Sequence, residues 1–249
     1  MRIISRLDIK GSNLIKGIQL EGLKVIGDPN FYAKKYFDDG ADELLLIDCV
    51  ASLYGRNNLF DIIKKASNEI FIPITVGGGI RSIDDAEKLF KSGADKIAIN
   101  SRAIVSPKII NTLAKNFGSQ AVVSSIQAKK FNNNKWLAYY DNGREKTEKD
   151  VIDWAKEAQD RGAGEILITS IDKEGTKKGF DIDLCELINS ICEIPVIYSG
   201  GMKSKSDLGQ FKDFSECDAL AVASILHYNE TSIKEIKNFA KNISFKVRV

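Results

Sequence analysis

The chain has 249 residues, of which 43% are hydrophobic and 28% are charged, and its formal net charge is +2. This apolar content is enough for a full core, and the interspersed acids and bases exclude the strongly basic surface of nucleic-acid or membrane partners. The cysteines fit no zinc-binding spacing, so we expect no metal site. They stand at positions 49, 185, 192 and 217.

The N-terminal sequence MRIISRLD lacks the pattern of a signal peptide. No apolar run reaches the roughly 18 residues that a membrane-spanning helix needs. We therefore expect a reduced, soluble and cytoplasmic protein.

Short apolar, β-branched runs alternate with longer amphipathic segments along the chain. The runs show little polar alternation, which is typical of parallel strands buried on both faces. The expected strands are 2–8, 43–49, 70–76, 95–100, 120–127, 165–170, 194–199 and 218–223. Helical patterns between them, such as 29–40, 82–93 and 148–162, begin near a capping residue and end at glycine.

The two halves of the chain match each other across an offset of about 122 residues. IPITVGGGI at 72–80 aligns with IPVIYSGGM at 194–202, and ADKIAINS at 94–101 aligns with CDALAVAS at 217–224. The strand count and the repeat predict an α/β fold, a (β/α)8 TIM barrel with an internal twofold half-barrel repeat. We expect one domain over 1–249, with half-barrels of about 1–119 and 120–249. A doubly wound open sheet is the alternative, but a twofold repeat closes more naturally into a ring.

Two segments are longer than a minimal strand–helix unit requires. Residues 9–27 are expected to form a long loop after the first strand, and residues 128–147 contain the hairpin signal DNG. Both would lie on the carboxyl face of the barrel, where active sites form and long loops often act as lids.

Glycine-bearing strand ends recur in both halves and predict two anion cradles. Gly79 ends the third expected strand and Gly201 the seventh, and backbone amides without a neighbouring Cβ can approach an oxyanion closely. Further donors follow the fourth, sixth and eighth strands. These are Asn100, Ser101, Gly175, Thr176, Ala223 and Ser224. The pairing predicts a ligand with a phosphate at each end.

Asp8 and Asp48 end the first two expected strands and are candidate general acids or bases. Lys16 lies on the following loop and could contact a phosphate, which favours a catalytic role for Asp8. Asp48 could equally be a helix cap or a loop anchor. His227, the only histidine, has no partner legible in the sequence, and we interpret it as structural. Because no nucleotide P-loop is present, we expect no cofactor.

Charged residues also stand at the opposite ends of the strands. Arg2, Glu43, Lys96 and Glu165 lie at or beside the starts of the first, second, fourth and sixth expected strands. Two basic and two acidic groups could form a closed ring there. The ring would be either a structural plug or a gate on a passage through the barrel axis.

These motifs together resemble the cyclase subunit of imidazole glycerol phosphate synthase. RLDIKGSNLIKG, TVGGGI, FGSQAVV, RGAGEILITSID and DKEGTKKG carry a likeness that runs nearly end to end. FGSQAVV and RGAGEILITSID favour this subunit over its sister barrel, the phosphoribosyl-formimino isomerase of the same pathway. That sugar-phosphate isomerase stays a further alternative with the same fold.

The resemblance implies a heterodimer with a glutaminase subunit docked on the bottom of the barrel. Ammonia would pass along the barrel axis to a bis-phosphorylated ribulosyl substrate, giving imidazole glycerol phosphate and an aminoimidazole carboxamide ribotide in histidine biosynthesis. Asp8 matches the first catalytic aspartate, Lys16 the loop lysine and Asp95 a residue of the glutaminase contact. The ammonia gate matches Arg2, Glu43, Lys96 and Glu165, and the phosphate sites match the cradle residues named above.

The chain departs from the family in its fifth and first expected strands and just after the first one, where Gly11-Ser12 stands in place of an acidic residue. The family has a second catalytic aspartate in an A-I-D-A-K context, whereas this chain reads SSIQAKK and carries Gln127. Glutamine cannot act as a general acid or base, and losing one such partner typically lowers the rate by about 10²–10⁴. Arg6 also replaces a usual cysteine.

Gln127 makes a diverged paralogue the leading hypothesis. Such a chain keeps the glutaminase dock and the ammonia passage but supplies ammonia to a third enzyme, for example one that makes amidino sugars for surface polysaccharides. The alternative is an active cyclase of histidine biosynthesis, in which Asp8 or a rearranged residue covers for Gln127.

Overall fold

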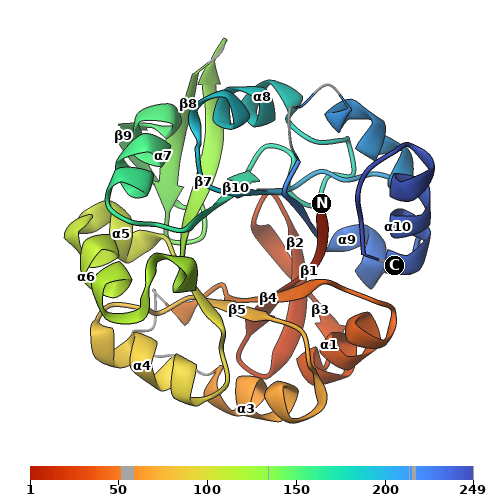
Figure 1. The fold of residues 1–249 in the computed structure, drawn as a ribbon, viewed down its shortest axis with the longest axis horizontal. Coiled ribbons are helices and arrows are strands. Elements are labelled where there is room, and N and C mark those ends of the chain that lie inside the picture. The colour runs from red at the N-terminus through yellow and green to blue at the C-terminus, as the bar shows by residue number, and fades with distance from the viewer. Residues whose placement is uncertain (52–58, 134, 213, 215–216, 249) are drawn as a thin grey trace.

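A computed structural model describes residues 1–51, 59–133, 135–212, 214 and 217–248. Figure 1 shows a ring of strands surrounded by helices. Eight parallel strands close the ring in the order β1, β4, β5, β6, β7, β10, β11, β12 and back to β1. The expected TIM barrel is therefore confirmed.

The strands of the ring are β1 (Arg2–Lys10), β4 (Glu43–Asp48), β5 (Ile74–Gly77), β6 (Lys96–Ile99), β7 (Val122–Asn132), β10 (Glu165–Ser170), β11 (Val196–Ser199) and β12 (Ala219–Val222). The longer helices around them are α1 (Pro29–Asp38), α3 (Phe60–Glu69), α4 (Ile83–Lys91), α6 (Lys108–Phe117), α7 (Val151–Asp160), α8 (Ile182–Ile191) and α10 (Ile233–Asn242). Shorter helical pieces are α5 (Ser101–Val105), α9 (Ser224–His227), η1 (Ser119–Ala121) and η2 (Lys205–Phe211).

Several helices begin where a side chain satisfies a free backbone amide. The Asp85 amide of α4 donates to the Ser82 hydroxyl at 3.2 Å, and the Ile152 amide of α7 donates to the Asp150 carboxylate at 2.8 Å. These are the capping interactions that the sequence pattern predicted. They fix the residue at which each of these helices begins.

The prediction of a long loop at 9–27 is wrong. This segment forms the antiparallel hairpin of β2 (Asn13–Ile18) and β3 (Glu21–Gly27), which pairs with β1. Gln19 and Leu20 make the turn with positive φ angles of 53° and 65°. That turn type is usually marked by Asn-Gly, so Gln-Leu carries no local signal.

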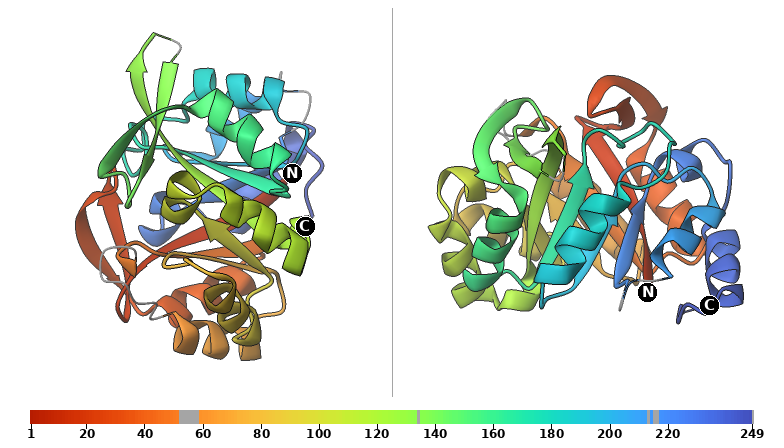
Figure 2. Two further views of the ribbon diagram at one scale, coloured as in Figure 1. Left: turned by 90° about the vertical axis from the view of Figure 1, so that its left-hand side faces the viewer. Right: turned by 90° about the horizontal axis from the view of Figure 1, so that it is seen from above.

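The DNG signal is confirmed as the turn between β8 (Lys135–Tyr140) and β9 (Glu145–Asp150). β8 in turn pairs with β7, and Figure 2 shows the β7–β8 pair projecting from the barrel. The turn between β8 and β9 touches the β2–β3 hairpin, because the Asn142 side-chain amide donates to the Leu20 carbonyl at 3.4 Å.

The expected strand at 70–76 begins later than predicted, at Ile74. Ile70 caps the C-terminus of α3, and the Pro73 carbonyl accepts a hydrogen bond from the Leu44 amide at 2.9 Å. The intervening residues therefore connect a helix to a strand. Phe71, which lies in this connection, is 80% exposed.

The hydrophobic core has two parts. The larger cluster fills the space between the outer faces of the strands and the helices. A smaller cluster lies inside the barrel, where side chains alternate with the outer ones along each strand. Its members are Ile4, Leu45, Ala98, Val123, Leu167, Ile197, Ala219 and Ala221, with Ile47 packed against them.

Candidate functional site

A cavity of about 310 Å³ opens at the carboxyl ends of β4 to β7. Gly79, Asn100 and Ser101, all predicted for the first anion cradle, line it, as do Asp48 and Gln127. Gly78 and Gly79 have φ angles of 102° and 72°, a conformation that glycine adopts without strain. Backbone and side-chain donors therefore converge on a space large enough for a small phosphorylated molecule.

The second cradle repeats the backbone of the first one. Gly200 and Gly201 have φ angles of 102° and 101°, and Ala223 has the unusual φ and ψ of −133° and −78°, close to −125° and −84° at Asn100. Its cavity is only about 20 Å³ and also includes Gly175 and Ser224. Thr176 is not among the lining residues, and its hydroxyl donates to the Lys173 carbonyl at 2.7 Å.

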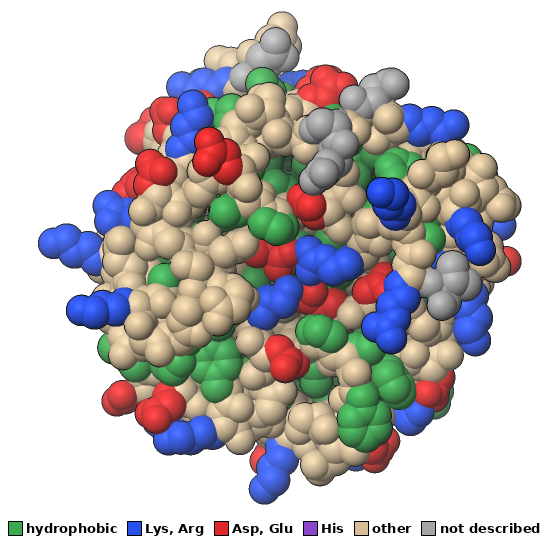
Figure 3. All heavy atoms as spheres, viewed as in Figure 1, with side chains coloured by type: hydrophobic (Ala, Val, Ile, Leu, Met, Phe, Trp, Pro, Cys, Tyr) green, Lys and Arg blue, Asp and Glu red, His purple; other side chains and the backbone are tan. Residues whose placement is uncertain are grey.

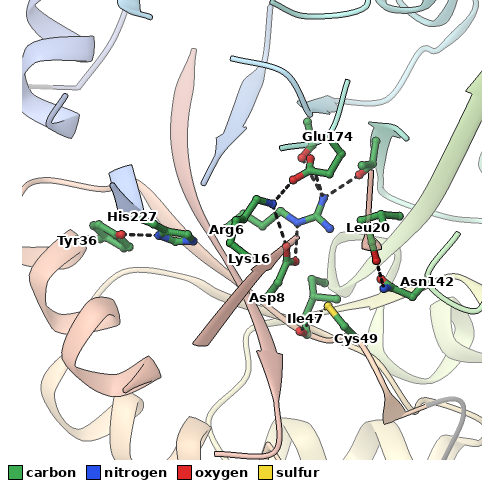
Figure 4. A network of polar contacts seen from close by, with 12 residues as sticks. Arg6, Asp8, Lys16, Leu20, Tyr36, Ile47, Cys49, Asn142, Glu174 and His227 are labelled. Atoms are coloured by element: carbon green, nitrogen blue, oxygen red, sulfur yellow. Dashed lines mark hydrogen bonds and ion pairs between the residues drawn. The ribbon is translucent and has the colours of Figure 1, made fainter. Parts of the chain in front are cut away.

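Four buried charged side chains meet at the top of the barrel, as Figure 4 shows. The Arg6 Nε donates to the Asp8 carboxylate at 2.9 Å, and the Lys16 Nζ lies 3.2 Å from the other Asp8 oxygen. Lys16 also pairs with Glu174, whose carboxylate lies 4.0 Å from the Arg6 guanidinium. Two cations thus neutralise two anions within this cluster.

The cluster holds its members in their charged forms. Burial alone would raise the pKa of Asp8, but Arg6 and Lys16 outweigh it and hold this pKa far below its usual range. Burial opposes the charge on Lys16 as well, yet Glu174 and Asp8 raise its pKa. A carboxylate held so strongly ionised is a weak proton acceptor near neutral pH.

Lys16 was predicted to contact a phosphate, and here its Nζ is occupied by Asp8 and Glu174. Glu174 was missed at the sequence level, although it directly precedes Gly175 in the loop after β10. Only the folding of β2 against that loop brings it to Lys16: the Gln19 amide donates to the Glu174 carbonyl at 2.7 Å.

Gln127 lies on β7 at the mouth of the larger cavity, 8% exposed. Its side-chain oxygen accepts a hydrogen bond from the Gly143 amide at 2.7 Å. The glutamine thus ties β7 to the turn between β8 and β9. Asp48 lines the same cavity, and its carboxylate accepts from the Val50 amide at 3.0 Å, as expected for a loop anchor.

The four charged residues predicted for the opposite end meet across the barrel. The Arg2 guanidinium contacts Glu43 at 2.8 Å and also pairs with Glu165, while the Lys96 Nζ lies 2.9 Å from each of the same two carboxylates. Basic and acidic side chains gather at the centre of the face that Figure 3 shows. We call this set, Arg2, Glu43, Lys96 and Glu165, the charged ring.

Asp95 is exposed beside the charged ring, and its carboxylate accepts from the Ile74 amide at 2.8 Å. In the same way, the Asp42 carboxylate accepts a hydrogen bond from the Ile3 amide, and the Asp218 carboxylate accepts one from the Val196 amide. Asp95 therefore has a structural role at the strand starts. Its predicted glutaminase contact stays a prediction.

His227 is buried, and its Nδ1 lies 2.6 Å from the Tyr36 hydroxyl, with the two rings stacked. Burial lowers its pKa to about 3, so the ring is neutral at physiological pH. This packing agrees with a structural interpretation. Among the described residues, no group of three His, Cys, Asp or Glu side chains is arranged to hold a metal ion, and no helix is long and apolar enough to cross a membrane.

Comparison with known proteins agrees with the barrel fold. A sequence profile of the family described as Histidine biosynthesis protein matches residues 2–232. The Imidazole glycerol phosphate synthase subunit HisF of Legionella pneumophila is 59% identical over 202 residues, which cover 81% of this chain and 95% of that protein. The subunit of the same name from Campylobacter concisus (strain 13826) is 45% identical over 250 residues, covering 100% of this chain and 98% of the relative. That of Alkaliphilus metalliredigens (strain QYMF) is 43% identical over 247 residues, covering 99% and 98%. The chain therefore belongs to the histidine biosynthesis protein family, among the HisF-type subunits of imidazole glycerol phosphate synthase.

Proposed function

We propose that this chain is the barrel subunit of a glutamine-dependent, imidazole glycerol phosphate synthase-type complex and receives ammonia from a glutaminase subunit. The observation that carries the proposal is the charged ring at the strand starts, directly beneath the apolar interior layer. A neutral molecule such as ammonia can cross an apolar layer, whereas ammonium and water are disfavoured there. The word "subunit" in the relatives' names fits a partner on this face.

The first candidate for the chemistry at the top is cyclisation of the bis-phosphorylated substrate. The comparisons favour it over the paralogue hypothesis, because the relatives named above are all imidazole glycerol phosphate synthase subunits. The larger cavity and the matched cradles support it as well. The phosphates would bind at the amides around Gly79 and Gly201, and Asp8 would be the remaining acid–base group.

The second candidate, delivery of ammonia to another acceptor, is favoured by two features of the site itself. Gln127 cannot exchange a proton near neutral pH. Asp8 is paired with both Arg6 and Lys16, which lowers its basicity. Neither feature affects the charged ring, so ammonia uptake would survive a loss of the cyclase reaction.

An assay with ammonium and the bis-phosphorylated substrate separates the two candidates. The second candidate predicts wild-type turnover to imidazole glycerol phosphate about 10²–10⁴ below that of an Asp-containing cyclase, with partial recovery in Gln127→Asp. Gln120→Asp, the same change at an exposed site far from the cavity, is the matched control. Wild-type turnover within about tenfold of an ordinary cyclase would establish the first candidate and sink the second.

The shared part of the proposal is tested with a glutaminase subunit of the imidazole glycerol phosphate synthase type. Mixing the two should raise glutamine hydrolysis, and Lys96→Met should weaken this effect or the transfer of ammonia. If the chain neither binds nor stimulates the glutaminase, the proposal fails for both candidates.

A further inference from the structure

The interior of the barrel is built in layers along β1. Alternate residues of a strand point to the same side, so Arg2, Ile4, Arg6 and Asp8 all face the axis. Arg2 belongs to the charged ring, and Ile4 belongs to the apolar layer above it. Arg6 forms the next layer, between the apolar residues and Asp8.

Arg6 reaches across the barrel at this level. Its guanidinium donates to the Thr169 hydroxyl on β10 and to the Ser199 hydroxyl on β11, both at 3.0 Å. β12 and β11 lie between β1 and β10 in the ring. The Arg6 side chain therefore crosses the barrel interior to reach a strand that is not a neighbour of its own. It is 2% exposed, and its guanidinium points toward Glu174 (Figure 4).

From this position we propose that Arg6 is the upper gate of the axial passage, opposite the charged ring at its lower end. The inference rests on the proposed ammonia function but holds for either candidate. A small molecule that crosses the apolar layer meets a guanidinium held by two hydroxyls and the Asp8 carboxylate. The cysteine usual at this position would leave most of that space free. Passage to the top therefore requires Arg6 to move.

The hydrogen-bond pattern explains why the closed state is stable. Every polar partner of Arg6 is itself buried, since Asp8, Thr169 and Ser199 are 4%, 1% and 5% exposed. Moving the guanidinium away would take this partner from the Thr169 and Ser199 hydroxyls and leave Asp8 with Lys16 alone in the interior, which is costly. Arg6 therefore moves aside only when another group takes over its contacts with Asp8, Thr169 and Ser199. Without such a group, small molecules rarely pass Arg6.

The test measures access to the apolar layer without any partner or substrate. Val123, a fully buried member of that layer, is changed to cysteine as a reporter in a chain whose four native cysteines are replaced by alanine or serine. Methyl methanethiolsulfonate, a small neutral thiol reagent, is added, and modification of the reporter is followed by mass spectrometry. We expect Arg6→Ala to accelerate labelling at least about tenfold over the Arg6 background.

Matched variants make the result interpretable. Arg102→Ala removes an arginine that lines the larger cavity but lies off the axis, and it should leave labelling unchanged. Lys96→Ala opens the lower ring and should accelerate labelling from the other end. Arg6→Ser serves as a second opening variant if Arg6→Ala lowers the melting temperature enough to admit the reagent by unfolding.

The proposal is overturned if both Arg6 variants are folded and label no faster than the parent, whatever Lys96→Ala does. Arg6 would then be only a member of a static ion-pair cluster. This result is independent of the glutaminase. If the chain fails to bind glutaminase, the proposed function is refuted. The labelling rates would still test whether Arg6 blocks access to the apolar layer.

Discussion

At the scale of single residues, both ends of the barrel balance two cations with two anions, but the upper cluster is more deeply buried than the charged ring. The upper cluster consists of Arg6, Asp8, Lys16 and Glu174. Arg6 and Gln127 depart from the family pattern, and both lie at the upper end of the barrel. The sequence alone identified both of them. It did not reveal that Arg6 binds Asp8, because that contact depends on side-chain direction inside the ring.

His227 makes the stability of the protein depend on pH. Its folded pKa of about 3 lies below the ordinary value of about 6.5, because burial disfavours the charged ring. Between these two pKa values only the unfolded state takes up the proton. The contribution of His227 to stability is therefore fully present above about pH 6.5 and is lost as the pH falls toward 3. We expect the free energy of unfolding to fall by about 2 kcal/mol from pH 7 to pH 5 because of this residue.

Urea unfolding of the wild type and of His227→Gln at both pH values measures this cost. Because glutamine cannot be protonated, the variant should lose less stability on acidification, although it is less stable at pH 7 through the lost Tyr36 contact. Equal losses in the two proteins would show that His227 is not the group responsible.

At the scale of elements, local signals predicted the repeating units but not the additions to them. Strand and helix positions followed from apolar runs and capping residues such as Ser82, whose interactions are local in sequence. The β2–β3 hairpin was missed because Gln19 and Leu20 adopt positive φ without glycine or asparagine. Leu20 is buried in the fold, so packing across the top of the barrel stabilises a turn that the local sequence does not specify.

The connection before β5 offers a test of glutaminase docking. Phe71 is 80% exposed at the lower end of the barrel, with its ring edge-on to Phe37 at a centroid distance of 6.3 Å. The repeat places Glu193 at the matching position. Apolar side chains gather beside α1 on the face that Figure 3 shows. An exposed aromatic residue at the lower end of the barrel is suited to anchor a partner.

We expect Phe71→Glu to weaken glutaminase binding by about tenfold or more in titration calorimetry, because buried aromatic anchors typically contribute above 1 kcal/mol. Phe131→Glu, an equivalent change on the projecting hairpin of the opposite face, is the control and should bind normally. An affinity that is unchanged in Phe71→Glu would place the dock elsewhere on the lower face.

At the scale of the whole molecule, the two halves are joined by continuous pairing. β6 pairs with β7 and β12 pairs with β1, so the sheet has no break at the boundary between the half-barrels. The near-identical dihedrals of Asn100 and Ala223 show that the repeat extends to the backbone. The sequence predicted this symmetry because glycines and apolar strands leave a strong pattern. The difference in cavity size between the two cradles depends on loop packing and had no sequence signal.

The continuous sheet predicts that the chain unfolds as one unit. Both tryptophans, Trp136 and Trp154, lie in the second half, so their fluorescence reports that half, whereas far-ultraviolet circular dichroism reports the entire chain. We expect the two signals to follow one urea transition. Separate midpoints would instead indicate half-barrels that fold independently, against the single domain predicted here.

The alternating signs of the charged ring have an evolutionary consequence. Each carboxylate, Glu43 and Glu165, is shared by the same two cations, so replacing any one member leaves buried charge unbalanced on both sides of the axis. Changes at this end must arise jointly, which makes them rare. The upper face carries no such constraint at Gln127, where an uncharged side chain accepts a hydrogen bond from a loop amide. Descendants of this barrel can therefore change the upper face one substitution at a time while the charged ring at the lower end stays the same.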